Sequence, residues 1–213
     1  MERWRLDAVV VGAGSAGAAA AWQLARRGLQ VALLDRQPAD SCGARWVDGV
    51  PLWMFDTARV PRPEPPECRL DRGAFVLLGK GERRPLRLAD TPMASVDIPQ
   101  LVGRLQGLCL DEAVSFFDRT SLRAVELDGE RPVAIRCLRR GADGGELRLR
   151  ADLFVDATGL RGAVRERVPA LDACCPRVPR AHTIEAVHQT CLVADLAGPR
   201  PSSPTCACGP ATG

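Results

Sequence analysis

The amino-acid sequence predicts an α/β protein with a parallel sheet and an inserted β-meander. Residues 8–11 form an apolar run, Ala-Val-Val-Val, that is typical of a buried parallel strand. A glycine-rich bend and a run of small residues over 18–27 follow, which indicates a helix packed closely on the sheet. A second apolar run over 30–34 completes a β-α-β unit that spans 6–35.

The meander is predicted from short strand-like runs that follow a helical pattern over 99–113. These runs are parted by glycine turns at 128–129 and 141–145, as in consecutive antiparallel hairpins. The runs cover residues 114–117, 122–127, 133–138 and 146–149. A further apolar strand over 153–155 leads into a second bend of small residues.

The first bend contains the pattern Gly12-x-Gly14-x-x-Gly17. Glycine at the first position permits a sharp turn, the second opens the backbone to a ligand, and the third allows close packing of helix on strand. Backbone N–H groups at the positive end of the helix would then meet a pyrophosphate. The residues predicted to surround it are Gly12, Ala13, Gly14, Ser15, Ala16 and Gly17.

Asp35 closes the second strand, 23 positions after Gly12. This is close to the spacing at which an acidic side chain accepts a hydrogen bond from a ribose hydroxyl. The alternative is an ordinary strand-turn-helix unit with chance glycines. The apolar strands on both sides of the pattern favour a dinucleotide site instead.

Bulk composition excludes several classes of protein. The chain has 213 residues with 46% hydrophobic content, which is enough for a packed core. A net charge of +3 indicates neither nucleic acid nor a membrane surface as a partner. Residues 8–25 carry no charge, but their glycine pattern is that of a nucleotide loop rather than a membrane span. With no targeting segment evident, we expect a cytoplasmic protein without a membrane span.

Nine cysteines and two histidines do not indicate a metal site, because no Cys-x-x-Cys pair occurs. Free thiols are expected, and Cys42 is interpreted as an unreactive thiol packed in a loop. Lys80 lies in a Gly-Lys-Gly turn and is interpreted as an exposed turn residue. The sequence assigns no catalytic residue.

The second bend, Asp156-Ala157-Thr158-Gly159, is what links the chain to a known family. A β-α-β unit, a meander and this bend together resemble a glutathione-reductase-type FAD-binding domain. Residues 155–165, Val-Asp-Ala-Thr-Gly-Leu-Arg-Gly-Ala-Val-Arg, resemble the aromatic hydroxylase and geranylgeranyl reductase group of flavoproteins. The resemblance covers roughly residues 6–165.

This resemblance implies an FAD-dependent oxidoreductase of the monooxygenase or alkene-reductase type, with NAD(P)H as reductant and an unknown small-molecule substrate. It places Asp35 at the adenosine ribose and Arg36 or Arg45 near the phosphates or adenine. It places Gln100 beside the flavin and Leu122 beside the adenine. The residues that would close over the adenosine-diphosphate end are Ala157, Thr158 and Gly159. For Arg45 and Gln100, a solvated surface side chain is an equal alternative.

The resemblance also implies a division of the chain into parts of two domains. Residues 1–72 would be the first part of the FAD-binding domain, with 36–72 irregular because of Pro51, Pro61, Pro63, Pro65 and Pro66. Residues 73–118 would supply partial substrate-domain strands, at 74–78, 84–88 and 93–97, and the helix. The FAD-binding domain would continue over 119–172, and 173–213 would be incomplete or disordered.

Two alternatives stay open. The first motif also suits an NAD-binding dehydrogenase, although strands and helices would then alternate after residue 35. The family carries a Gly-Asp motif further downstream that nothing after residue 165 resembles, so we expect a truncated chain with an incomplete substrate domain. A non-catalytic nucleotide-binding remnant therefore stays open too, whereas a flavin halogenase is disfavoured because no tryptophan-rich signature is visible.

Overall fold

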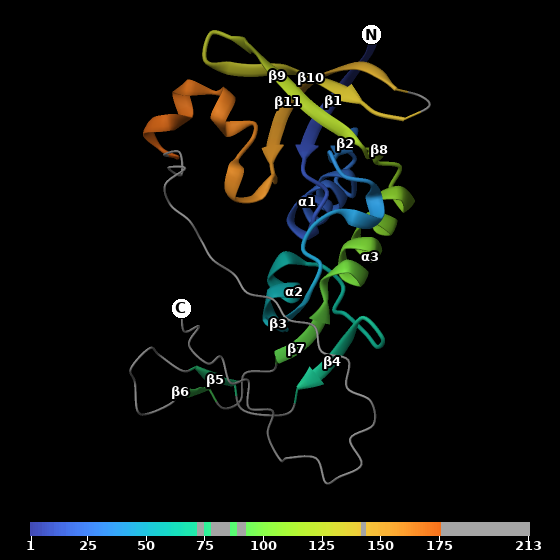
Figure 1. Cartoon of the computed structure of the whole chain (residues 1–213), viewed down its shortest axis with the longest axis vertical. Helices are drawn as coiled ribbons and strands as arrows, with labels where there is room; N and C mark the ends of the chain where they lie inside the picture. The colour runs from blue at the N-terminus through green and yellow to red at the C-terminus, as the bar shows by residue number, and fades with distance from the viewer. Residues whose placement is uncertain (72–74, 78–85, 89–92, 142–143, 176–213) are drawn as a thin grey trace, which may run out of the picture.

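A six-stranded sheet organises the computed structural model, which describes residues 1–71, 75–77, 86–88, 93–141 and 144–175. The strand order is β8-β2-β1-β11-β10-β9 (Figure 1). Four strands run parallel: β1 (Glu2–Val11), β2 (Val31–Leu34), β8 (Ser115–Phe117) and β11 (Gly145–Asp156). The strands β10 (Arg131–Arg139) and β9 (Thr120–Asp128) extend the sheet in antiparallel fashion. The predicted α/β fold with a parallel sheet and a meander is confirmed.

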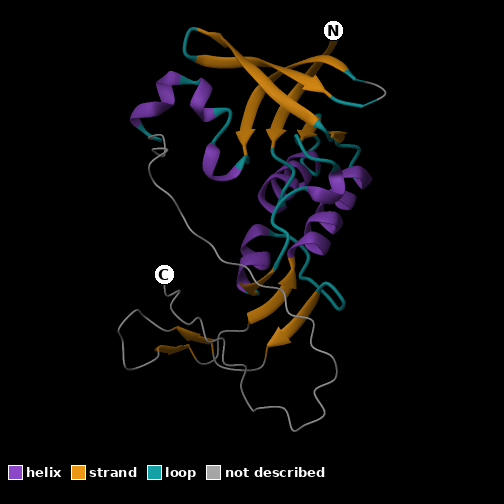
Figure 2. Ribbon diagram, viewed as in Figure 1, coloured by secondary structure: helices purple, strands orange, loops and turns teal. Residues whose placement is uncertain are grey.

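Two helices cover one face of this sheet, α1 (Ser15–Ala25) and α3 (Ile98–Asp111) (Figure 2). The helix α1 carries alanine and glycine on its buried side, which lets it lie close to β1 and to α3. The helix α3 begins where Asp97 accepts a hydrogen bond from the backbone of Gln100. Leu101 and Leu105 of the predicted apolar stripe are buried in the core between helices and sheet.

A second core fills the opposite face of the sheet. Apolar residues of β1 and β2 meet the inward side of the meander there, including Ile135 and Leu149. The short 3-10 turns η3 (Arg165–Arg167) and η4 (Pro169–Ala173) border it, with Val164 and Val168 buried. The sheet is therefore covered on both faces around the C-terminal half of β1 and β2, as buried parallel strands require.

A small separate sheet has the order β3-β7-β4, with β3 (Val47–Pro51), β7 (Met93–Asp97) and β4 (Cys68–Asp71). The helix α2 (Trp53–Ala58) follows β3, and a hairpin pairs β5 (Phe75–Leu77) with β6 (Leu86–Leu88). The predicted strand at 93–97 is confirmed, and so is the predicted strand pair within the described residues.

The expectation that 36–72 is irregular is wrong. This segment contains η1 (Ala39–Ser41), β3, α2 and β4. The prolines limit the length of these elements rather than prevent them, since Pro51 ends β3 and most of the others lie in the loop between α2 and β4.

The meander also differs from its prediction in two places. Residues 115–117 form β8, which pairs parallel with β2 at the far edge of the sheet and lies outside the meander. The runs at 146–149 and 153–155 form one strand, β11, because Arg150 pairs with both β10 and β1 and Ala151 continues the ladder to β1. Most of the predicted C-terminal segment, residues 176–213, lies outside the described residues. No described helix combines the length and apolar character needed to cross a membrane.

Candidate dinucleotide site

The two predicted bends lie side by side at one edge of the sheet. The strands β1 and β11 are parallel neighbours, with Val11 opposite Asp156, so both bends begin at the same level. The backbone N–H of Ala157 donates to the carbonyl of Val11 at 2.8 Å. A Cβ atom on Gly12 would lie 2.3 Å from the Ala157 carbonyl oxygen, and one on Gly17 would lie 1.7 Å from the Gly12 carbonyl oxygen. This closeness is possible only because both positions are glycine.

The first turn of α1 is open at its positive end. Gly14 precedes the helix, no described side chain caps it, and its first turn contains no acidic residue. Ser15 and Ala16 are exposed, whereas Gly17 is buried against the bend. Free backbone N–H groups and the helix dipole therefore meet at a surface that a phosphate group can reach.

Two side chains hold the backbone of Ala13 in place. Its N–H donates to a carboxylate oxygen of Asp35 at 2.8 Å, and its carbonyl accepts from the amide of Gln106 at 3.0 Å. The other oxygen of Asp35 accepts from the backbone N–H of Gln37 at 2.8 Å. Asp35 is thus fixed beside the bend, and each oxygen keeps a lone pair for a ribose hydroxyl.

Gln106 is a residue of the site that sequence reasoning missed. It is buried on α3, among the apolar residues that pack against the sheet and α1. A single amide within an otherwise apolar helical stripe was the available signal, because a buried amide needs a hydrogen-bond partner.

The loop after η1 passes directly over the first bend. Gly43 has a φ of 77°, and a Cβ atom there would lie 3.3 Å from the Cα of Gly14. Its neighbour Cys42 is buried, and burial together with the charge of Asp35 raises the pKa of the Cys42 thiol to about 12. The thiol stays protonated at neutral pH, which agrees with the interpretation of Cys42 as an unreactive packing residue.

Buried thiols make the stability of this chain sensitive to alkaline pH. Burial raises the pKa of Cys109 to about 11 and that of Cys137 to about 12. Because these values lie above the ordinary thiol pKa, the thiols of the unfolded chain lose their protons first as pH rises. The free energy of unfolding is therefore unaffected by these thiols below about pH 8.5 and falls above it. Each thiol should contribute a slope of up to about −1.4 kcal/mol per pH unit in the free energy of unfolding near pH 10.

Urea denaturation at several alkaline pH values measures this slope. The chain has no tyrosine and a single lysine, Lys80, so thiols dominate the titration in this range. In the variant C137A, the slope of unfolding free energy against pH should be shallower by the contribution of one thiol. A stability that stays constant from pH 9 to 11 would contradict the prediction.

The second bend is organised by Asp156. One carboxylate oxygen accepts from the backbone N–H of Thr158 at 3.1 Å and from its hydroxyl at 2.6 Å. The other accepts from the backbone N–H groups of Val164 and Arg165, at 2.8 and 2.9 Å. The Thr158 hydroxyl in turn accepts from the N–H of Ala163 at 2.6 Å. The bend is therefore a fixed structure before any ligand is present.

Leu122 lies near Asp35, although the two are far apart in sequence. The N–H of Thr120, at the start of β9, donates to the Asp35 carbonyl at 2.7 Å. Leu122 lies two residues further, about 7 Å along the strand. Arg36 directly follows Asp35, Arg45 lies two residues after Gly43, and both arginines are exposed.

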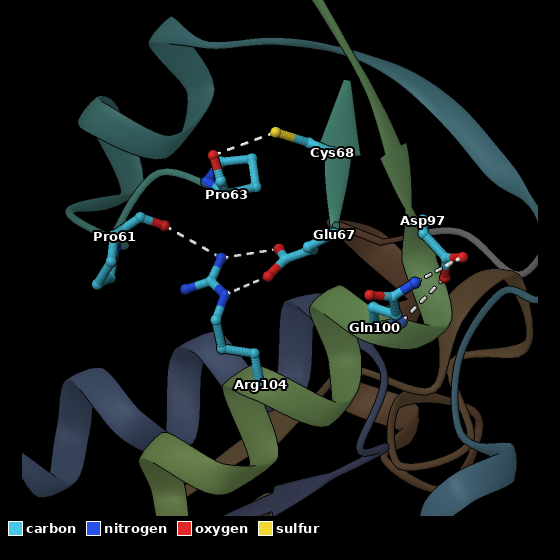
Figure 3. A network of polar contacts seen from close by, with 7 residues as sticks. All are labelled: Pro61, Pro63, Glu67, Cys68, Asp97, Gln100 and Arg104. Carbon is cyan, nitrogen blue, oxygen red and sulfur yellow. Dashed lines mark hydrogen bonds and ion pairs between the residues drawn. The ribbon is translucent and has the colours of Figure 1, made fainter. Parts of the chain in front are cut away.

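Gln100 is engaged with Asp97 rather than with the residues of the two bends (Figure 3). Its side-chain amide donates to Asp97 at 3.2 Å, at the first turn of α3. It precedes Gln106 by six residues, which places the two about 120° apart around the helix axis. It lines a cleft of about 580 Å³ with the proline-rich loop that precedes β4.

The same view shows how that loop is fastened to α3. The guanidinium of Arg104 donates to both oxygens of Glu67, at 2.6 and 2.9 Å, and to the carbonyl of Pro61 at 3.2 Å (Figure 3). Within the described residues, no cluster of histidine, cysteine and carboxylate side chains is arranged to hold a metal ion.

Two glycine-dependent bends at the carboxyl ends of parallel strands are typical of nucleotide-binding α/β folds. The family model for FAD dependent oxidoreductases matches residues 7–54. The chain is 26% identical over 171 residues to digeranylgeranylglycerophospholipid reductase of Sulfolobus acidocaldarius, covering 79% of this chain. The N-terminal part of the chain is therefore similar to FAD dependent oxidoreductases, and a longer part is similar to a lipid reductase and to a hydroxylase.

Solved structures share this fold. A geranylgeranyl bacteriochlorophyll reductase-like protein from Thermoplasma acidophilum superposes with a TM-score of 0.59 at 15% identity, covering 71% of this chain and 38% of its own. Aklavinone-11 hydroxylase, in complex with FAD and aklavinone, superposes with a TM-score of 0.54 at 26% identity, covering 76% of this chain and 34% of its own. The chain spans 37% of the length of the Sulfolobus reductase.

Proposed function

We propose that this chain is the nucleotide-binding part of an FAD-dependent oxidoreductase that takes hydride from NAD(P)H and reduces carbon–carbon double bonds in an isoprenoid lipid. The contact between the two bends at the open end of α1 carries this proposal, because a pyrophosphate needs close backbone approach and free N–H groups. The reductase type is favoured by the Sulfolobus relative, whose name describes a reductase of a digeranylgeranyl lipid.

In this proposal the chain's own residues position the cofactor. The bend from Gly12 to Gly17 donates backbone N–H groups to the pyrophosphate, and Asp35 accepts from the adenosine ribose. The second bend, Ala157 to Gly159, closes the adenosine-diphosphate end, and Leu122 borders the adenine. The observed support is the fixed position of Asp35 beside Ala13 and the short path from Asp35 to β9.

The two arginines have a supporting role. Arg36 and Arg45 are exposed near the ends of β2 and of the loop over Gly14, where either could approach a phosphate or the adenine. Gln100 stays a prediction of the resemblance alone, since it is engaged with Asp97. When bound, FAD supplies hydride chemistry that no protein side chain offers.

We also propose the division of the chain into FAD-binding residues 1–72 and 119–172, substrate-domain residues 73–118 and a further segment over 173–213. The separate sheet of β3, β7 and β4 supports it, because that sheet shares no strand with the six-stranded sheet. It also draws β3 and β4 from residues 1–72, so the substrate-domain sheet includes strands from both sides of this boundary.

A second candidate is a monooxygenase. It is favoured by the 26% identity to aklavinone-11 hydroxylase over 76% of this chain. The two candidates share the nucleotide-binding part and differ in what the reduced cofactor meets next, oxygen or an alkene.

Anaerobic reduction of the reconstituted chain tests the proposal. The purified chain mixed with FAD and desalted should stay yellow, and NADPH or NADH should bleach its flavin absorption. Rapid oxygen uptake after reduction would favour the monooxygenase. Bound FAD that neither nicotinamide reduces would contradict the reductase and support the non-catalytic alternative, whereas tight binding of NAD with no uptake of FAD would support the dehydrogenase.

A further inference from the structure

One face of the six-stranded sheet gathers five arginines, here named the arginine face: Arg3, Arg5, Arg136, Arg148 and Arg150. The strand register places Arg3 opposite Arg148, Arg148 opposite Arg136, and Arg5 opposite Arg150. Residues paired in this way point to the same side of a sheet, with Cβ atoms about 5 Å apart. The five side chains thus form a compact group over β1, β11 and β10, the strands in the upper part of Figure 1.

The arginine face points away from the protein interior. The residues that alternate with the arginines, such as Leu6, Leu147 and Leu149, belong to the second core. Since successive side chains of a strand alternate between faces, the arginines lie on the opposite side. Four of the five are exposed and Arg148 is half-buried.

Acidic neighbours balance only part of this charge. Glu126 of β9 accepts from Arg148 at 2.6 Å and lies 3.7 Å from Arg136. Glu146 and Asp152 border the group on β11, and Asp152 lies 3.8 Å from Arg131. Within the part of the chain that the structure describes, Arg3, Arg5 and Arg150 form no ion pair.

Like charges placed directly opposite each other on neighbouring strands destabilise a sheet. A binding partner of opposite charge would offset this cost. Net charge alone does not reveal the feature, because the chain carries only +3 overall and the register brings together arginines from three separate segments.

We propose that the arginine face docks this chain on a bilayer surface rich in anionic phospholipids. Guanidinium groups pair with phosphate oxygens through two parallel hydrogen bonds, and several arginines on one face reach neighbouring lipid head groups together. A sheet face is broad, and it offers neither a helix for a nucleic-acid groove nor aromatic rings among these five positions for base stacking. The proposal goes beyond the nucleotide site and does not depend on which substrate that site takes.

Vesicle sedimentation with the full chain tests the proposal. The wild-type chain should sediment with vesicles that mix phosphatidylcholine and phosphatidylglycerol, stay in solution with phosphatidylcholine alone, and be released by high salt. The variant R3Q/R5Q/R150Q should lose on the order of 100-fold in partitioning to the anionic vesicles.

The matched control is R59Q/R69Q/R140Q, which removes three exposed arginines elsewhere on the chain. Both variants change the net charge from +3 to 0, because each loses three positive charges. The control should partition within a fewfold of the wild-type chain. An equal loss in both variants would overturn the proposal, because net charge and not the arginine face would then explain binding.

A lysine variant, R3K/R5K/R150K, keeps the charge and should retain most of the partitioning, so the test does not depend on the glutamine variant folding. Failure of the wild-type chain to prefer anionic vesicles would overturn the proposal. So would tighter binding to duplex DNA than to vesicles at the same salt concentration. FAD uptake should be unchanged in all three variants, which separates this test from that of the nucleotide site.

Discussion

Replacing Gly17 with alanine is expected to weaken FAD binding by at least about 100-fold and to lower the free energy of unfolding by about 3 kcal/mol. The added Cβ would lie 1.7 Å from the Gly12 carbonyl oxygen and 3.1 Å from the Cβ of Ala157. A backbone oxygen cannot yield as a flexible side chain can. The helix α1 must therefore move away from both bends. Titration of FAD followed by flavin fluorescence measures the first effect, and urea denaturation the second.

The matched control is Gly107→Ala. Gly107 lies within α3, and a Cβ there would meet no atom within 4 Å beyond the backbone of its own helix. Alanine in a helix interior should leave FAD binding unchanged and stabilise the chain by up to about 1 kcal/mol. If the Gly17→Ala variant binds FAD as tightly as the wild-type chain, close packing of helix α1 on the first bend is not needed for FAD binding.

The second large effect is expected for Asp156→Ala, with a loss of about 3 kcal/mol of stability and at least a tenfold loss of FAD affinity. Its carboxylate accepts four hydrogen bonds, including two from the backbone N–H groups of Val164 and Arg165. Without them, those donors lose their partner and the second bend loses its fixed shape. The same two titrations measure both quantities.

Asp152→Ala serves as the control for this substitution. Asp152 lies on the same strand, but its side chain is 81% exposed and its contact with Arg131 is 3.8 Å. A surface pair of this kind contributes less than about 1 kcal/mol. If both alanine variants lose the same stability, the network around Asp156 does not carry the second bend.

The local parts of the nucleotide site were predictable from the sequence. Gly12 and Gly17 occur where a backbone contact excludes any side chain. Only glycine fits there, so the requirement is visible in the sequence as a glycine motif. Asp35 follows an apolar run at the end of a strand, and a parallel neighbour brings that end to the bend. The edge at which both bends meet follows from the parallel direction of β1 and β11.

Contacts across long stretches of sequence were not predictable in this way. Gln106 reaches the carbonyl of Ala13 across 93 positions, and no local pattern encodes which carbonyl a buried amide will find. The carboxylate of Asp35 was expected at a ribose, but its hydrogen bond to Ala13 depends on how the bend folds back.

Strand direction and pairing were the other source of error. The apolar run at 114–117 reads the same in an antiparallel meander and in a parallel edge strand, and only packing of α3 against the sheet returns it beside β2. Arg150 and Asp152 interrupted the apolar pattern, so β11 was divided in two, whereas in the structure Arg148 and Arg150 lie on its outward face. In the segment after Asp35, prolines concealed short elements that other strands stabilise.

Competition between nucleotide fragments tests the central claim most directly, which is that the two bends together hold the adenosine-diphosphate half of one FAD molecule. The chain is loaded with FAD and titrated separately with ADP and with FMN, while the release of FAD is followed by its fluorescence. ADP should displace FAD in a concentration-dependent manner and FMN should not, because the proposed partners of Gly14 and Asp35, the pyrophosphate and the ribose, belong to the adenosine-diphosphate half of FAD. Displacement by FMN with no effect of ADP would contradict the account.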